Sequence, residues 1–302
     1  MTMFLFITTV LIWGTTWIAI ALQLGDVPVL VSVFYRFALA GVVFVLTLAL
    51  MRRLEWPAWR QQRWIWAQAM CLFSVNFICF YIAAGYLPSG VVSLIFSLAT
   101  VFNALNARLF FGDRINGQTL MAAGLGLGGL ALIFAGDIAD ARVGTDAWIG
   151  MVFAGVGTVC FSLGNMVSRR NSAHGISPVT ANAWGMCYGA LILLALIGLS
   201  GTTITLPNDP VYLGALAYLS VIGSVIGFTT YLIMVARIGS AKAAYATVMF
   251  PIVALAISTA VEGYSWGLMN TAGLALALCG NLVMFAPAKM MRRFTPRARH
   301  AI

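Results

Sequence analysis

Long apolar stretches alternate with short polar connections along the whole of this 302-residue chain. Most stretches reach about 20 residues, the length that an α-helix needs to cross the hydrocarbon core of a bilayer. The pattern predicts ten spans, at residues 3–22, 29–50, 64–84, 90–111, 117–136, 147–168, 178–199, 210–236, 241–261 and 268–286. A lipid-embedded barrel would need segments in which polar and apolar residues alternate, and the apolar run at 120–134 does not alternate.

The second half of the chain repeats features of the first half roughly 150 residues later. The matching pairs are Tyr81 and Tyr231, Ser89 and Ser240, and Asp113 and Glu262. We therefore predict two five-helix units, at residues 1–140 and 141–288, followed by a basic tail at residues 289–302. The joint falls in the longest external connection, near residues 136–146.

The hairpin loops of the two units differ in charge. In the first unit the loop after Tyr81 is uncharged, whereas Arg108 and Arg114 lie at the far end of the next span. In the second unit the loop carries Arg237 and Lys242, and the far end has no basic residue. Because Lys and Arg avoid translocation, the two hairpins should face opposite sides of the bilayer. Such inverted repeats build the midplane site of many secondary transporters.

The composition excludes a water-soluble domain. Hydrophobic residues make up 62% of the chain, charged residues 8%, and the mean hydropathy is +0.97, so polar surface is too scarce to cover a soluble protein of this length. All five cysteines lie inside predicted spans, and neither a disulfide framework nor a zinc pattern is present. The sequence predicts no metal site and no cofactor, and a cleaved signal peptide is not expected.

The net charge of +9 would suggest a nucleic-acid partner in a soluble chain, but membrane topology explains it better. With the amino terminus inside, only Arg142 is external and only Arg36 lies within a span. The other fifteen basic residues fall at cytoplasmic ends: Arg52, Arg53, Arg60, Arg63, Arg108, Arg114, Arg169, Arg170, Arg237, Lys242, Lys289, Arg292, Arg293, Arg297 and Arg299. We therefore expect a multi-pass protein of the cell inner membrane with both termini cytoplasmic and no nucleic-acid partner.

Glycines spaced four residues apart occur in three spans. The pairs are Gly124 and Gly128, Gly185 and Gly189, and Gly223 and Gly227. Small residues let helices approach closely in lipid, and we expect packing within one chain, with a dimer face as the alternative. The sequence does not require an oligomer.

Several motifs resemble those of a known family of carriers. The first span carries Leu11-Ile-Trp-Gly-Thr-Thr-Trp17, Arg36 follows Phe34-Tyr35, the fourth span closes on Phe111-Gly-Asp113, and Met249-Phe-Pro251 precedes Val261-Glu262. With ten spans, the chain resembles the drug/metabolite transporter superfamily in its EamA-type branch, and most of all the bacterial exporters of amino acids, including aromatic ones. The resemblance implies an all-α membrane fold of ten helices, built as two inverted five-helix repeats around a central cavity, and alternating access.

Polar groups near the span centres are candidates for the substrate site, because a desolvated zwitterion must replace its lost water contacts. The candidates are Asn76, Ser97, Asn103 and Asn165. A buried Ser or Thr is often satisfied by a carbonyl of its own helix, which is the competing interpretation.

Aromatic residues at helical spacing are the second set of cavity candidates. They are Trp13, Trp17, Phe77, Tyr81, Phe161, Phe228, Tyr231 and Tyr245. Such rings more often fill a membrane core than line a cavity. Where they line one, they favour flat or apolar ligands, and an ammonium group can rest on a ring face.

Four residues are predicted to have structural or gating roles: Arg36, Pro88, Pro251 and Glu262. Arg36 is a functional candidate because it is charged within a span, and it would bind a substrate carboxylate or pair with an external acid such as Glu262. Pro251 should kink the ninth span, and Thr100 stands at the matching position of the fourth, so equal bending of the two is not predicted. We expect the hairpins at 85–90 and 238–241 to move as outer and inner gates.

We therefore predict a secondary transporter that exports small metabolites, most of all amino acids with aromatic members among them. A multidrug or other metabolite carrier of the same fold is the alternative. An integral membrane enzyme would need metal ligands, an acid pair or an activated nucleophile, and the sequence shows no such set. A channel would need a continuous polar lining. The expected partners are a small-molecule substrate and the lipid bilayer.

Overall fold

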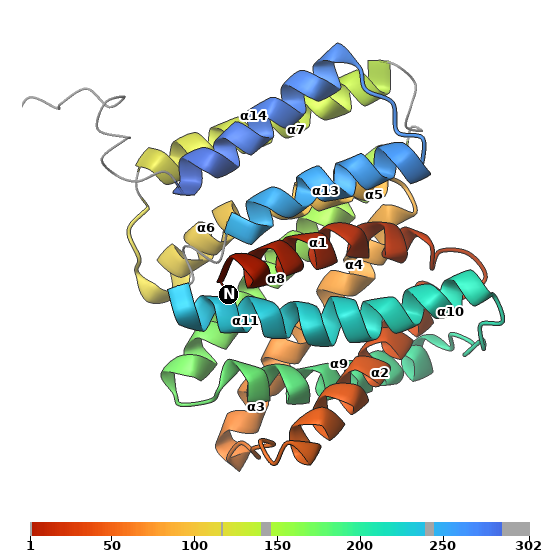
Figure 1. Ribbon diagram of the computed structural model, residues 1–302, viewed down its shortest axis with the longest axis vertical. Coiled ribbons are helices and arrows are strands. Elements are labelled where there is room, and N and C mark those ends of the chain that lie inside the picture. Colours follow the sequence, from red (N-terminus) through yellow and green to blue (C-terminus); the bar gives the residue numbers. More distant parts are fainter. Residues whose placement is uncertain (1, 116, 140–145, 239–244, 286–302) are drawn as a thin grey trace, which may run out of the picture.

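The computed structural model describes residues 2–115, 117–139, 146–238 and 245–285, and the regular structure in these ranges is helical. Figure 1 shows the arrangement. The elements are α1 (Thr2–Ala21), α2 (Val29–Leu50), α3 (Trp59–Ala69), η1 (Met70–Val75), α4 (Asn76–Ala84), α5 (Ser89–Ser97), α6 (Ala99–Phe111), α7 (Gly117–Ala139), α8 (Ala147–Ala173), α9 (Pro178–Ser200), α10 (Pro210–Ala217), η2 (Tyr218–Ile226), α11 (Gly227–Ile238), α13 (Tyr245–Val261) and α14 (Leu268–Phe285). The elements η1 and η2 are π-helices.

Each predicted span coincides with one helix or with consecutive helices. The third span consists of α3, η1 and α4, the fourth of α5 and α6, and the eighth of α10, η2 and α11. Within the described ranges, seven helices are long and apolar enough to cross a membrane, and shorter apolar segments lie in α7, α13 and α14. The prediction of a ten-helix, all-α membrane protein is confirmed.

The contacts between helices repeat in the two halves with the halves exchanged. The first span packs on the ninth through α1 and α13, and its counterpart in the second half, α8, packs on the fourth span through α5 and α6. Likewise α1 packs on α11 of the eighth span, and α8 packs on α4 of the third. The self-matching pairs α2 with α9, α5 with α13 and α7 with α14 are also in contact. This pattern is the one expected of two inverted repeats that interlock.

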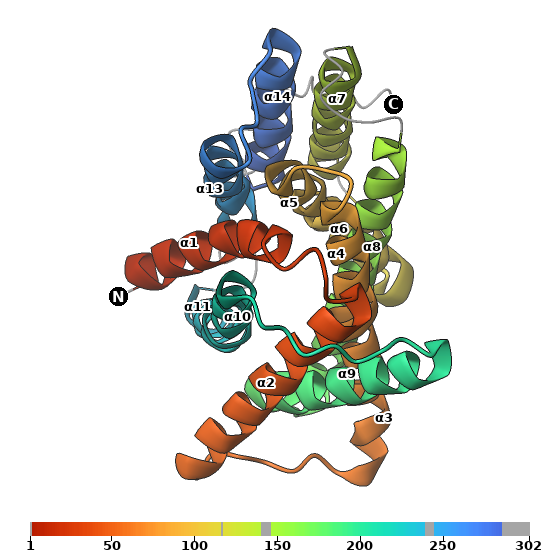
Figure 2. The same ribbon diagram turned by 90° about the vertical axis from the view of Figure 1, so that its right-hand side faces the viewer.

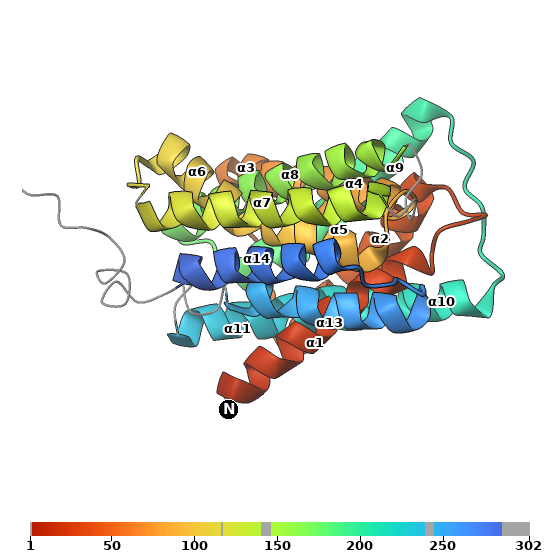
Figure 3. The same ribbon diagram turned by 90° about the horizontal axis from the view of Figure 1, so that it is seen from above.

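The connections gather at two ends of the bundle. The α1–α2, α9–α10 and α13–α14 connections lie together at one end, and the α6–α7 connection and the end of α11 lie at the other (Figure 3). Short connections between long antiparallel helices leave the backbone polar groups of the spans paired within the helices, as a bilayer requires.

The fourth and ninth spans are shaped by different means. The fourth is interrupted at Leu98, whose N–H donates to the Ile95 carbonyl in a 3₁₀-type bond of 3.1 Å. The Ser97 and Thr100 hydroxyls donate to carbonyls one turn earlier in the same span, and such bonds weaken the regular ladder. In the ninth span Pro251 lies inside the continuous helix α13.

The helices α7 and α14 form a pair at one edge of the molecule (Figure 2). Their backbones approach closely at Gly129 and Gly273, where a Cβ atom on either residue would lie 2.5 Å from the other's carbonyl oxygen. Gly124, singled out by its spacing in the sequence, faces open space, whereas Gly185 and Gly189 pack on Phe73 within the chain.

Replacing Gly129 by Ala should therefore destabilise the pair of helices. We expect a loss of about 1 to 3 kcal/mol, because the opposing group is backbone and cannot rotate away. Gly124→Ala on the same helix is the matched control and should be neutral or stabilising by up to about 1 kcal/mol, since alanine favours helix more than glycine does. Thermal unfolding of the purified protein checks both values, and equal effects of the two variants would contradict the proposed packing.

Candidate functional site

A small cavity lies at the centre of the bundle, where spans from both halves meet. Its volume is about 50 Å³. It is lined by Trp13, Thr16, Trp17, Ile20, Arg36, Asn76, Phe77, Phe80, Phe96, Phe161, Gly223, Phe228 and Phe250. These residues come from α1, α2, α4, α5, α8, η2, α11 and α13, so neither half forms the cavity alone.

Arg36 is the charged residue of the cavity lining. Its side chain is buried, with 2% of the residue exposed, and its Nε donates to Ser224 Oγ at 3.3 Å. The guanidinium carbon lies 4.3 Å from the ring centroid of Phe77. Its Nη1 has no hydrogen-bond partner among the described residues. A buried guanidinium with a free donor is costly, and an anionic ligand would relieve that cost.

A second unpaired donor belongs to Asn76, which is fully buried at the start of α4. Its Oδ1 accepts a hydrogen bond of 2.8 Å from the Phe77 N–H, which fixes the side chain. The Nδ2 group has no partner in the described part of the chain. Two buried donors in one apolar cavity are suited to the oxygens of a carboxylate.

The two π-helices stand at matching places in the third and eighth spans, where η1 leads directly into Asn76 and η2 carries Ser224, the acceptor of the Arg36 Nε hydrogen bond. In η1 the Ser74 hydroxyl donates to the carbonyl of Ala69, and in η2 the Ser224 hydroxyl donates to the carbonyl of Leu219. In each case the acceptor is the carbonyl five residues earlier, which is the hydrogen-bond spacing of a π-helix. π-helical segments are frequent at functional sites, and the Ser-Val pair that recurs at 74 and 224 is a signal in the sequence that could have pointed to them.

Aromatic rings form the remaining wall. Trp17 lies 5.3 Å from Phe80 and 6.3 Å from Phe250 between ring centroids, and Phe96 lies 4.7 Å from Phe161. On the other side Trp13 contacts Phe228 at 5.5 Å. Ring faces accept flat apolar groups and hold a nearby cation weakly.

The cavity is contracted in this structure. Its volume of about 50 Å³ is far below the roughly 300 to 1,000 Å³ of ordinary ligand pockets. An organic substrate therefore needs the aromatic wall to open. The closed packing continues outward, where the Tyr81 hydroxyl donates to Gln23 Oε1 at 2.6 Å and links the third span to the α1–α2 connection.

The structure brings half of the predicted cavity residues together. Those that line the cavity are Trp13, Trp17, Asn76, Phe77, Phe161 and Phe228. Arg36, expected from the sequence to have a structural or gating role, lies among them and not beside Glu262.

Five predicted residues lie elsewhere. Tyr81 is bonded to Gln23, and Ser97 donates to the Leu94 carbonyl of its own helix. Asn165 Nδ2 donates to Asn103 Oδ1 at 3.3 Å, so these two amides join the fourth and sixth spans. Tyr231 packs behind the wall, 5.0 Å from the Trp13 ring. The side chain of Tyr245 lies outside the described part of the structure.

The sequence pattern missed six lining residues: Thr16, Ile20, Phe80, Phe96, Gly223 and Phe250. The helices that carry these residues are apolar on more than one face. Hydrophobic periodicity in the sequence therefore did not separate residues of the cavity wall from residues of the packed core. Gly223 makes room beside the charge, since a Cβ there would lie 2.8 Å from Thr16 Cγ2 and 3.8 Å from Arg36 Nη2.

Glu262 binds the amino-terminal end of α5, at the hairpin that contains Pro88. Its carboxylate accepts hydrogen bonds from the Ser89 N–H at 3.1 and 3.2 Å and from the Ser89 hydroxyl at 2.7 Å. The Ser258 hydroxyl also donates to it. A carboxylate at a helix amino terminus satisfies free N–H groups and the helix dipole. Beneath it Gly90 allows contact with Leu255, where a Cβ would lie 2.9 Å from the Leu255 Cα.

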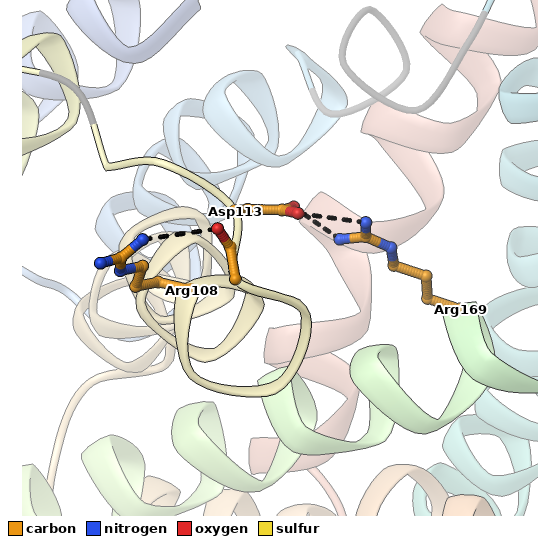
Figure 4. Close-up of polar contacts among 4 residues, drawn as sticks. Arg108, Asp113 and Arg169 are labelled. Atoms are coloured by element: carbon orange, nitrogen blue, oxygen red, sulfur yellow. Dashed lines mark hydrogen bonds and ion pairs between the residues drawn. The ribbon is translucent and has the colours of Figure 1, made fainter.

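Asp113, the counterpart of Glu262 in the first half, forms an ion pair with Arg169 at the opposite end of the bundle (Figure 4). The Asp113 Oδ2 atom accepts a hydrogen bond of 2.7 Å from Arg169 Nη1. Beside it Arg108 donates to the Gly112 carbonyl at 3.4 Å. The hydrogen bond and the charge of Arg169 hold the pKa of the Asp113 carboxyl below its ordinary value. The pair joins α8 to the end of α6.

The contribution of this ion pair to the stability of the fold depends on pH. Because the folded-state pKa of Asp113 is lowered, the pair stabilises the fold fully above the ordinary carboxyl pKa. This contribution is lost as the pH falls through the lowered pKa. We expect Asp113→Asn to be only slightly less stable than the wild type at neutral pH, because the side chains of Asp113 and Arg169 are both exposed, and we expect this difference to shrink as the pH falls below the ordinary carboxyl pKa. Thermal unfolding across this range checks it, and a difference that grows on acidification would overturn the assignment.

Comparison with known protein families identifies the same family in both halves of the chain. The family described as "EamA-like transporter family" matches residues 1–135 and again residues 148–286. A crystal structure of a protein with 20% sequence identity superposes with a TM-score of 0.67 over 98% of this chain and 99% of that chain. This likeness supports the fold.

Similar proteins from several organisms carry transporter names. An Archaeoglobus fulgidus protein, "Uncharacterized transporter", is 21% identical over 90% of this chain and 94% of its own length. "Uncharacterized inner membrane transporter YedA" of Escherichia coli K12 is 24% identical over 84% of this chain and 80% of its own. "Probable terminal-alkyne amino-acid exporter" of Streptantibioticus cattleyicolor is 26% identical over 70% of this chain and 66% of its own.

Proposed function

This chain belongs to the EamA-like transporter family, as its motifs predicted, and from that premise we propose that it exports aromatic and other apolar amino acids across the inner membrane by alternating access. It is a multi-pass membrane transporter, so a small-molecule substrate and the lipid bilayer are its partners. The observation that carries the substrate class is a pair of buried donors in an aromatic cavity, Arg36 Nη1 and Asn76 Nδ2, which have no hydrogen-bond partner among the residues that the structure describes.

The charge of the lining favours a substrate with a carboxylate. Arg36 is positive, and among the described residues that line the cavity none is Asp or Glu, so an organic cation would enter a repulsive field, while a carboxylate gains a charge-assisted hydrogen bond. The ammonium group of an amino acid would rest on the ring faces. A carrier of cationic drugs, the alternative within the same fold, is therefore disfavoured. The name of the Streptantibioticus relative, an amino-acid exporter, points the same way.

Alternating access would expose the cavity to each side in turn. The Glu262 cap on α5 and the Tyr81–Gln23 bond hold the end of the bundle where Pro88 lies. Our topology places this end outside and both termini in the cytoplasm, because Arg108, Arg169 and Arg170 lie at the other end. Substrate would enter when the aromatic wall opens toward the cytoplasm.

The test is counterflow in proteoliposomes that are loaded with unlabelled L-phenylalanine and diluted into labelled L-phenylalanine. We expect saturable, transient accumulation that L-tryptophan inhibits and that phenethylamine, which lacks the carboxylate, does not. Flux linear in concentration would indicate a channel, and equal inhibition by phenethylamine would refute the carboxylate model. No exchange of any aromatic amino acid would remove the substrate class and leave the fold in place.

A further inference from the structure

A second groove, separate from the central cavity, lies between the end of α2, the start of α9 and the other face of η2 and α11. Its volume is about 720 Å³. Its lining comes from the end of α2 and the residues that follow it, the start of α9, and η2 with α11. Figure 2 shows how α2 diverges from α10 and α11 toward this end.

The walls of the groove within the spans are mainly apolar. Phe44, Leu48 and Val225 are buried at its base, while Ile226 and Ile233 are partly exposed along η2 and α11. The polar Thr229 and Thr230 hydroxyls donate to carbonyls of their own helix and present methyl groups. A groove of this size and polarity between spans is suited to an acyl chain of the surrounding lipid.

The mouth of the groove is basic. Arg52 and Arg53 follow α2 directly and are exposed, and neither guanidinium has a hydrogen-bond or ion-pair partner among the residues that the structure describes. The acid of the lining, Glu55, accepts a hydrogen bond of 3.1 Å from the Thr180 hydroxyl. Two arginines and one glutamate leave the mouth of the groove with a net positive charge. At the other end of the bundle a hollow lined by residues 22–27, 205–209 and Tyr212 contains Asp26 and Asp209, and no basic residue is among its described lining.

The backbone of Arg52 is strained in a way that points to its side chain. Its φ is 55°, and among the described non-glycine residues it alone has a positive φ. The Arg53 N–H donates to the Leu48 carbonyl at 2.8 Å and closes a helix-ending turn in which glycine is the favoured residue. Arginine in that conformation costs stability, and such strain is retained where the side chain has another use.

We propose that this groove binds an anionic phospholipid of the inner leaflet, with its phosphate on Arg52 and Arg53 and one acyl chain along α2 and α11. Basic residues clustered at the end of a span, just outside the hydrocarbon core, attract anionic lipid headgroups. Each basic residue raises the affinity about fivefold. The apolar floor of the groove holds the acyl chain of the lipid. This contact distinguishes a bound lipid from a free anion. The site is distinct from the transport cavity and does not depend on which substrate is carried.

The test is native mass spectrometry of the purified full chain with phosphatidylglycerol or phosphatidylcholine. We expect tight retention of phosphatidylglycerol and loss of selectivity in stages, roughly fivefold in Arg52→Gly and about 25-fold in the double variant R52G/R53Q. Arg52→Gly also relieves the backbone strain, so its melting temperature in neutral detergent should not fall. Arg114→Gln, which removes one charge elsewhere on the same side, is the matched control and should bind as the wild type does.

The chain-binding part of the groove is tested separately by Thr229→Trp, which should weaken phosphatidylglycerol binding with both arginines in place. Inorganic phosphate should neither stabilise the protein nor compete with the lipid. Equal loss of affinity in Arg114→Gln and Arg52→Gly would reduce the effect to general surface charge, and stabilisation by phosphate alone would show a free-anion site. Either result would overturn the proposal.

Discussion

Arg36→Gln should abolish transport of carboxylate substrates while the protein stays folded. Truncating one partner of a buried, charged hydrogen bond costs about 2 to 5 kcal/mol, so we expect at least a 30-fold loss in kcat/KM for amino-acid exchange. The side chain lies in the cavity lining with Nη1 unpaired, so its removal also takes away an uncompensated buried charge. For this reason the variant should be no less stable than the wild type when no substrate is present.

The discriminating measurement is specificity. The wild type should prefer L-phenylalanine over phenethylamine, and Arg36→Gln should lose that preference because the group that reads the carboxylate is gone. Arg36→Lys should recover part of the activity, since it keeps the charge without the planar fork. Ser224→Ala, which removes the Nε acceptor 3.3 Å away, should lower the rate less and leave specificity unchanged. Unaltered preference in Arg36→Gln would show that the residue is structural.

Glu262→Ala should release the end of α5 and weaken the outer closure. The carboxylate accepts bonds from the Ser89 N–H, the Ser89 hydroxyl and the Ser258 hydroxyl, and removing it leaves a helix amino terminus without its cap. We expect a loss of about 2 kcal/mol in the free energy of unfolding. Glu262→Gln keeps one acceptor and should lose roughly half as much.

Accessibility separates a gating role from a general loss of stability. In a background without native cysteines, Ser93→Cys on buried α5 should react faster with a membrane-impermeant thiol reagent when Glu262 is replaced by Ala. Asp26→Ala, an exposed acid on the same side of the bundle, is the matched control and should change neither the reaction rate nor stability by more than about 0.5 kcal/mol. A loss of stability without any increase in the rate of labelling would show that Glu262 has a structural role and no gating role.

The sequence predicted the helices and their number well, since a bilayer leaves few alternatives. Each span must satisfy its own backbone polar groups, so an apolar run such as 29–50 can be read directly as helix α2. The exchanged charges around Arg108 and Arg237 predicted the inversion of the repeats, because basic residues lie mainly on the cytoplasmic side of a membrane protein. The residues that break the helices were less visible. The sequence pointed to Pro251, whereas the interruption at Leu98 and the two π-helices depend on hydroxyl groups that bond to the backbone.

By itself, then, the sequence determined a ten-helix inverted repeat and its family, and about half of the cavity lining. The tertiary structure decided which polar groups remain unpaired. Asn103, Asn165, Ser97 and Asn76 look alike in the sequence, yet the first two bond to each other, Ser97 bonds to its own helix, and Asn76 keeps a free donor in the cavity. Likewise Arg36 and Glu262 were a plausible pair until packing gave each a different partner. Hydrogen-bond partners from distant spans are set by how helices cross, and helical periodicity carries no information about that crossing.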